Sequence, residues 1–201
     1  MKWSKSLGSR PDSNPPRYLS KNNANISRIN ALQKLFPTSN ILVIFRHPLA
    51  QIGSLAKQHQ HFLHEHATDS FSRQYMEWIG HYEFGENLRP INFGGWLDGA
   101  ELPGQIDEAF WMRYWNAAYS YVLQNRTDKV LFLDFDLLLQ DGRESLDRVS
   151  KSLDLRHDRV LIDAADTLRS PTTRPVERNR CPTDVWNRAQ DIYAQLRSLA
   201  V

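Results

Sequence analysis

The sequence has almost no cysteine and no long apolar segment, and both features limit what the protein can be. Cys181 is the one cysteine among 201 residues, so no disulfide can form within the chain and no cysteine-based zinc site can be built around it. No apolar run reaches the roughly 20 residues that cross a bilayer, and residues 1–16 hold no apolar run of the kind found in a secretory signal. We therefore expect a cytoplasmic protein without a membrane span.

Acidic residues are missing from one long stretch of the chain. None lies between Ser13 and His64, and the segment 1–64 carries nine Lys or Arg against a single acid. The segment 65–166 is acidic, with nineteen Asp or Glu against ten Lys or Arg, and 167–201 is basic again. Two interpretations stay open: a solvated surface of mixed charge, or two basic ends that converge on one polyanionic ligand.

The apolar pattern predicts a single α/β domain. Residues 1–16 are polar and rich in proline, as in a flexible lead-in, and the domain is expected over 17–201. Two short apolar runs, 41–45 and 130–133, lack polar alternation and are typical of strands buried on both faces of a parallel sheet. Helical spacing between and after these runs predicts a short parallel sheet flanked by helices.

The clearest helix is expected over 107–124, where apolar residues recur at helical spacing. A loop rich in Gly and Pro, 84–105, precedes it and has the length of a functional loop. The other predicted elements are a short strand over 17–21, helices over 25–36, 48–61, 69–82, 143–153 and 157–168, and a last helix capped by Thr183.

Arg46 stands where an anion would bind. Ligands of open α/β sheets lie beyond the carboxyl ends of the strands, and Arg46 directly follows the run 41–45. Pro48 then begins a helix whose free N–H groups favour negative charge at the same place. Arg46 can donate two hydrogen bonds to a phosphate, and Ser54 is a second donor two turns along the helix. The alternative, an arginine paired with a carboxylate, is less favoured because the surrounding sequence lacks acidic residues.

This stretch resembles the 3′-phosphate-binding part of the sulfotransferase superfamily. The residues that carry the resemblance are Lys21, Phe36-Pro37, Arg46, Pro48 and Ser54. The resemblance implies a partial P-loop-type three-layer fold, and transfer of a sulfuryl group from 3′-phosphoadenosine 5′-phosphosulfate to a hydroxyl or amine acceptor. It also implies that Arg46 and Ser54 bind the 3′-phosphate of this donor. Lys21 is implied to be catalytic, because a positive charge stabilises the negative charge that develops on the bridging oxygen.

A basic loop over 169–180 lies where some sulfotransferases close over the nucleotide. The resemblance implies that Arg174 contacts the donor there, and a plain solvated basic loop is the alternative.

One part of the family pattern is not found. A complete sulfotransferase begins with a strand, a Gly-rich loop for the 5′-phosphosulfate and a helix. Ser6–Arg10 is the nearest match, but no apolar strand precedes it and prolines follow it. We therefore expect a truncated chain, with a missing N-terminal half and weak or no catalysis alone. The alternative is a non-catalytic module that binds a nucleotide or phosphate, or a decayed fragment.

Several other groups of residues bear on function. A cluster of histidines around Glu65 (His59, His61, His64, His66) suggests a metal site, but no further ligands recur, so we expect no metal and favour a role in acceptor binding. Asp134 and Asp136 are expected to be turn or capping residues. Trp111 and Trp115 fit a buried helix face, and Trp96 is a candidate for acceptor contact. A nucleic-acid binder ranks last, because exposed aromatic residues do not alternate with basic ones.

Overall fold

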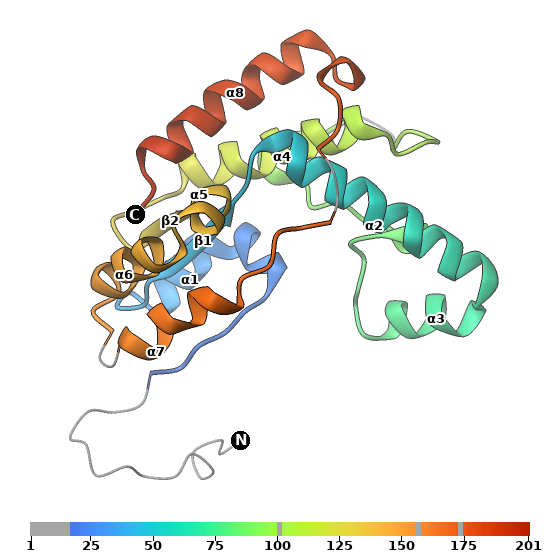
Figure 1. The fold of residues 1–201 in the computed structure, drawn as a ribbon. Coiled ribbons are helices and arrows are strands. Elements are labelled where there is room, and N and C mark those ends of the chain that lie inside the picture. The colour runs from blue at the N-terminus through green and yellow to red at the C-terminus, as the bar shows by residue number, and fades with distance from the viewer. Residues whose placement is uncertain (1–16, 100–101, 156–157, 173–174) are drawn as a thin grey trace.

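The computed structural model describes residues 17–99, 102–155, 158–172 and 175–201. Two strands pair at its centre, and helices surround them (Figure 1). The α-helices are α1 (Ile29–Leu35), α2 (Pro48–Thr68), α3 (Ser70–Trp78), α4 (Glu108–Gln124), α5 (Phe135–Gln140), α6 (Gly142–Ser152), α7 (Asp158–Asp163) and α8 (Thr183–Ser198). Short 3-10 helices are η1 (Asn23–Arg28), η2 (Gly85–Asn87), η3 (Phe93–Gly95), η4 (Ala164–Thr167) and η5 (Arg178–Arg180).

The sheet consists of β1 (Ile41–Phe45) and β2 (Val130–Asp134), which run parallel. Ile41 lies opposite Val130, and Phe45 lies opposite Asp134. Both carboxyl ends therefore meet at the same edge of the sheet, although about 90 residues of chain separate them. The two apolar runs were predicted as parallel strands, and this coarse α/β prediction is confirmed.

Apolar side chains pack against both faces of the sheet. The larger core joins Phe45 and Phe132 to the helices α2, α4 and α8, with Trp111, Trp115 and Leu196 at its centre. A smaller core joins Leu133 to α5 and α6. The prediction that the aromatic face of the long helix is core is confirmed, since Trp111 and Trp115 are almost fully buried.

The helices α2 and α3 extend away from the sheet (Figure 1). α2 continues to Thr68, one to two turns beyond the predicted end. Asp69 separates it from α3 and caps α3, because the Asp69 Oδ1 accepts a hydrogen bond of 2.9 Å from the Phe71 N–H. α4 begins in the same way, with the Asp107 Oδ1 2.7 Å from the Phe110 N–H.

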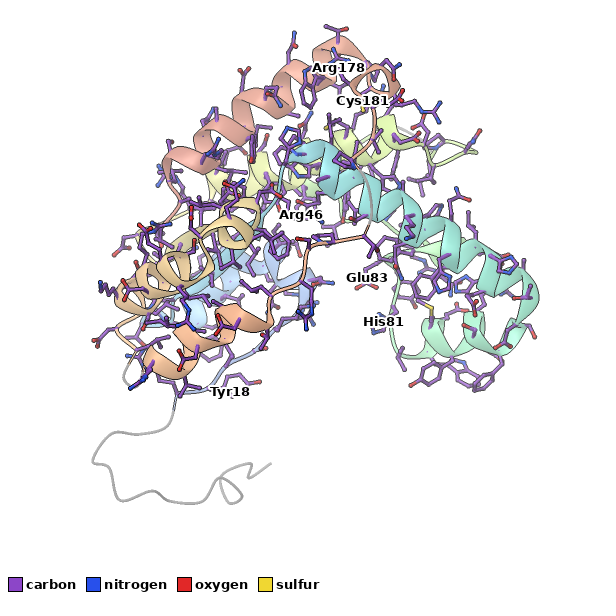
Figure 2. The ribbon with its side chains drawn as sticks, in the orientation of Figure 1. Tyr18, Arg46, His81, Glu83, Arg178 and Cys181 are labelled. Atoms are coloured by element: carbon purple, nitrogen blue, oxygen red, sulfur yellow. The ribbon has the colours of Figure 1, made fainter. Side chains whose placement is uncertain are left out.

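Three local predictions are wrong. No strand forms over 17–21: residues 17–22 have no regular structure, and Tyr18 and Leu19 are more than 90 % exposed and so bury no apolar face. Tyr18 lies at the margin of the molecule in Figure 2. Thr183 does not cap α8, since it is the first helical residue and Pro182 takes the cap position. A short helix, α5, begins directly after β2, where no helix was predicted.

Candidate functional site

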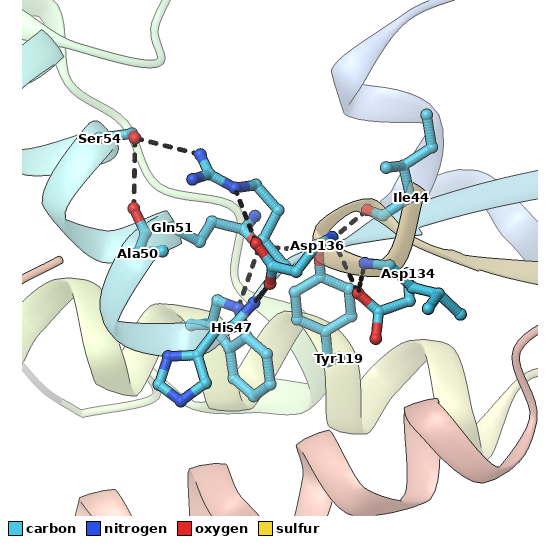
Figure 3. Close-up of polar contacts among 11 residues, drawn as sticks. Ile44, His47, Ala50, Gln51, Ser54, Tyr119, Asp134 and Asp136 are labelled. Atoms are coloured by element: carbon cyan, nitrogen blue, oxygen red, sulfur yellow. Dashed lines mark hydrogen bonds and ion pairs between the residues drawn. The ribbon is translucent and has the colours of Figure 1, made fainter. Parts of the chain in front are cut away.

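The structure brings Arg46 and Ser54 together at the carboxyl edge of β1. The Arg46 Nη1 donates a hydrogen bond of 3.3 Å to the Ser54 Oγ, and the Ser54 hydroxyl lies 3.2 Å from the carbonyl oxygen of Ala50 (Figure 3). This contact is possible because Ser54 lies on the face of α2 that turns back toward the end of the strand. Two residues that were predicted to share a phosphate site thus contact each other.

The Arg46 side chain is held in a largely enclosed position. Only 18 % of it is exposed, and its guanidinium carbon lies 5.2 Å from the centre of the Phe135 ring. The Nε is buried and has no hydrogen-bond partner among the described residues. A buried, incompletely satisfied guanidinium is costly unless a further acceptor binds it.

A carboxylate lies beside this guanidinium, contrary to the expectation from the surrounding sequence. The Asp136 Oδ1 is 4.0 Å from the Arg46 Nε, and the Asp136 Oδ2 accepts a hydrogen bond of 2.6 Å from the backbone N–H of His47. Asp136 comes from the first turn of α5, directly after β2. It therefore satisfies one free N–H at the start of α2 and lowers the net positive charge around Arg46.

Asp134 is a capping residue, as expected. Its Oδ1 accepts hydrogen bonds from the backbone N–H groups of Asp136 and Leu137, at 2.9 and 3.2 Å. Its Oδ2 lies 3.3 Å from the Arg197 Nε of α8. The cap fixes the first turn of α5, and this turn places the Asp136 carboxylate against Arg46 and the start of α2.

Buried side chains of α4 contact the end of β1 and the first turns of α2 and hold them in position. The Tyr119 hydroxyl lies 3.2 Å from both the carbonyl oxygen of Ile44 and the Gln51 Oε1, and the Trp115 Nε1 donates to the same Oε1 at 3.1 Å. Burial raises the pKa of Tyr119 to about 12, so the phenol remains a neutral hydrogen-bonding group across the physiological range. This support fixes β1 and α2 relative to each other and so fixes the Arg46–Ser54 pair.

His47 lies between Arg46 and α8. Its ring centre is 5.3 Å from that of Tyr193 and 6.0 Å from that of Trp186. Burial lowers the pKa of His47, although Asp136 and Asp134 act in the opposite direction. The imidazole is thus neutral near pH 7 and adds no fixed charge to the site.

The basic loop after α7 passes beside the start of α2. The backbone N–H of Val176 donates a hydrogen bond of 3.1 Å to the carbonyl oxygen of Leu49 in the first turn of α2, and Figure 1 shows this segment crossing from α7 to α8. Val176 therefore lies beside the first turn of α2, and closure of this loop over a ligand stays a prediction. Arg174 itself lies outside the described residues, and its role stays a prediction.

Lys21 is not joined to the Arg46–Ser54 pair. It lies in the exposed segment 17–22, and no hydrogen bond or ion pair links it to any other residue in the described parts of the chain. Its catalytic role also stays a prediction.

Two members of the predicted histidine cluster, His59 and His66, make structural contacts, and the role in acceptor binding expected for the cluster stays a prediction. His59 and His66 are buried on one face of α2, and their Nδ1 atoms accept hydrogen bonds from the successive backbone N–H groups of Gly85 and Glu86, at 3.1 and 3.2 Å. The His66 Nε2 lies 3.4 Å from the Met76 sulfur of α3. These contacts hold the loop after α3 against α2. Within the described ranges, no group of three or more His, Cys, Asp or Glu side chains is placed to hold a metal ion.

Comparisons with known proteins gave no relative. No family model, no curated protein and no solved structure matches the chain. Among the described helices, none has both the length and the apolar character needed to cross a membrane. Any functional assignment thus depends on the residues and geometry of the site.

Sequence reasoning missed Asp136 as a neighbour of Arg46. The signal was present, because Asp136 closely follows the second apolar run as Arg46 follows the first. Parallel pairing puts both strand ends at one edge, so two predicted parallel strands imply that the polar residues after them meet.

Proposed function

We propose that this chain is a sulfotransferase-like protein. In this proposal it binds 3′-phosphoadenosine 5′-phosphosulfate with the 3′-phosphate on Arg46 and Ser54, and it transfers the sulfuryl group to a hydroxyl or amine acceptor. The observation that carries the proposal is the hydrogen bond between Arg46 and Ser54 at the carboxyl edge of β1. These two residues are eight positions apart in sequence, and Arg46 donates to Ser54 at the place where α/β sheets bind ligands.

The donor set suits a phosphate. The guanidinium of Arg46 supplies charge-assisted N–H donors, and the first turn of α2 adds the positive end of the helix dipole. The Ser54 hydroxyl donates to the Ala50 carbonyl oxygen in this structure, and it would donate to a phosphate after rotating about its Cβ–Oγ bond. Asp136 offsets part of this positive charge, but it approaches the Nε, whereas the Ser54 contact is made by Nη1. In the proposal, the terminal N–H groups of Arg46 that are not used by Ser54 would donate to the phosphate.

The chain's own residues would bind and orient the donor. Arg46 and Ser54 would hold its 3′-phosphate, and the loop around Val176 would cover the nucleotide next to α2. The donor, when bound, supplies the activated sulfuryl group and the bisphosphate leaving group. Lys21 would stabilise the negative charge on that leaving group.

A non-catalytic nucleotide-binding module is the second candidate. The exposed position of Lys21, without a contact to Arg46 or Ser54, favours this alternative. Incubation with the sulfuryl donor and a set of hydroxyl and amine acceptors, followed by measurement of released 3′,5′-adenosine bisphosphate, separates the two. Release that Lys21→Ala abolishes supports the enzyme, and tight binding without release supports the module.

The proposed site is tested by comparing two nucleotides that differ at the 3′ position. We expect 3′,5′-adenosine bisphosphate to bind at least about tenfold more tightly than 5′-adenosine monophosphate in calorimetric titrations, because a phosphate held by charged donors contributes about 1.5–3 kcal/mol. Equal affinity for the two nucleotides, or no binding of either by the folded protein, would overturn the proposal.

A further inference from the structure

A cavity of about 390 Å³ lies between α4, η3 and α8, away from the Arg46 site. Asn116, Ala117 and Ser120 line it from α4. Trp115 and Tyr119, on the other face of the same helix, contact Gln51 of α2. Because successive helical residues are rotated by about 100°, α4 separates the cavity from the Arg46 site. A ligand in the cavity would be distinct from one on Arg46.

One side of the cavity is aromatic and rigid. Phe93, Trp96 and Tyr121 line it. The Trp96 Nε1 donates a hydrogen bond of 2.9 Å to the carbonyl oxygen of Ile91, and the Tyr121 hydroxyl donates one of 3.1 Å to the carbonyl oxygen of Ser27. Both polar atoms are thus already satisfied inside the protein, and the rings are fixed in place. They offer apolar contact to a ligand ring at low entropic cost.

The other side of the cavity carries two arginines. Arg188 of α8 donates through its Nη2 to the Ser120 hydroxyl at 3.1 Å, which holds its guanidinium across from α4. Arg113 of α4 is exposed and forms no hydrogen bond or ion pair with any described residue. Most donors of the two guanidinium groups therefore remain available to an anion.

Two acceptors complete the lining. Asn116 is only 5 % exposed, and its Nδ2 donates a hydrogen bond of 2.8 Å to the carbonyl oxygen of Val185. Its Oδ1 is buried and accepts no hydrogen bond from the described parts of the chain. Asp184, in the first turn of α8, is exposed, forms no hydrogen bond or ion pair with any described residue, and lines the same cavity. A ligand N–H or O–H group would satisfy acceptors that the protein leaves without a donor.

We propose that this cavity is a second binding site, for a ring-bearing anion such as a nucleoside monophosphate. The ring lies against Trp96, Phe93 and Tyr121, and the phosphate takes hydrogen bonds from Arg113 and Arg188. Hydroxyl or amino groups of the ligand donate to Asp184 and Asn116. Binding pockets for small molecules combine apolar walls with a few convergent polar groups in this way. The inference does not depend on the proposed activity at Arg46.

The test uses 5′-adenosine monophosphate and the full chain carrying Arg46→Ala, so that the Arg46 site cannot account for binding. We expect saturable binding by calorimetry, and a change in tryptophan fluorescence that Trp96→Phe removes. Adding Arg113→Ala or Arg188→Ala raises the Kd at least about tenfold, because each removes charge-assisted hydrogen bonds. Arg126→Ala, which removes a similar exposed charge just beyond the end of α4, leaves the Kd within about twofold.

Inorganic phosphate and phenyl phosphate separate the roles of ring and anion. Phenyl phosphate binds measurably and inorganic phosphate at least about tenfold more weakly, because phosphate alone lacks the aromatic contacts. Three results would overturn the proposal: no saturable binding of 5′-adenosine monophosphate, an unchanged Kd in both arginine variants, or equal affinity for inorganic phosphate and the ring compounds. Thermal melts of each variant establish that the exposed substitutions leave the fold intact.

Discussion

Gly85 is the residue at which the loop after α3 comes closest to α2, and replacing it tests how tightly that loop is held. Its φ angle is +71°, and a Cβ built there would lie 2.6 Å from the His66 Cε1, 2.7 Å from the His66 Nδ1 and 3.0 Å from the Phe62 Cβ. Gly85→Ala therefore forces either the backbone or the His66 ring to move. Movement breaks the hydrogen bonds that His59 and His66 accept from the loop.

The cost has two parts. A non-glycine residue in the left-handed region costs about 1–2 kcal/mol, and loss of one or two buried hydrogen bonds adds about 1–2 kcal/mol. The free energy of unfolding should thus fall by about 2–4 kcal/mol, which for a chain of this size lowers the Tm by roughly 4–16 °C. Gly80 is a matched control: its φ is +74°, but nothing lies within 4 Å of an added Cβ. Gly80→Ala should show only the backbone cost of about 1–2 kcal/mol.

Urea and thermal unfolding followed by circular dichroism measure both variants against the wild-type chain. The difference between Gly85→Ala and Gly80→Ala isolates the contacts with the histidines. If Gly85→Ala destabilises the protein no more than Gly80→Ala does, the loop is not fixed by His59 and His66, and the reasoning fails.

Three further predictions concern pH, Asp136 and Ser54. Burial lowers the pKa of His59, so the imidazole binds a proton more readily in the unfolded chain than in the folded one. The free energy of unfolding therefore falls as the pH drops below about 6.5. His59→Gln should weaken this pH dependence in urea titrations between pH 7 and 5. Asp136→Ala leaves the His47 N–H without its acceptor and lowers the free energy of unfolding by about 1–3 kcal/mol. Asp136→Asn keeps an acceptor oxygen and lowers it by less. Equal losses in the two variants would show that Asp136 does not stabilise the fold as the acceptor of the His47 N–H. Ser54→Ala weakens binding of 3′,5′-adenosine bisphosphate at least about tenfold in calorimetry, because a hydrogen bond to a charged phosphate contributes about 1.5–3 kcal/mol. It also lowers the free energy of unfolding by about 0.5–1.5 kcal/mol, because the Arg46 Nη1 loses its acceptor. Unchanged affinity would remove Ser54 from the site.

The buried elements of the fold follow from sequence patterns. The runs 41–45 and 130–133 are apolar without alternation, and the helix over 107–124 has a long apolar face, so burial alone specifies these three elements. The strand expected over 17–21 does not form because Tyr18 and Leu19 have no apolar surface to pack against. Short elements such as α5, although most of its residues are apolar, depend on capping by Asp134, which the apolar pattern does not report.

The site could be predicted only in part. Arg46 and Ser54 are close in sequence and share one strand–helix unit, so their spacing predicts their contact. The contact between Asp136 and Arg46 spans 90 residues and depends on the strand register. The sequence favours a role in acceptor binding for the histidines, because their spacing shows a shared helix face but does not reveal that the backbone of a distant loop donates to His59 and His66.

The central claim is that Arg46 holds the 3′-phosphate of an adenosine nucleotide. Calorimetric titration with 3′,5′-adenosine bisphosphate, in wild type, Arg46→Ala and Arg28→Ala, tests it most directly. Arg28 is an exposed arginine of the same acid-free stretch and serves as the charge control. The account predicts that Arg46→Ala raises the Kd by about 10–100-fold while Arg28→Ala changes it by less than about threefold. Equal, small effects of both substitutions on a nucleotide that binds wild type would show that the phosphate binds elsewhere and would contradict the account.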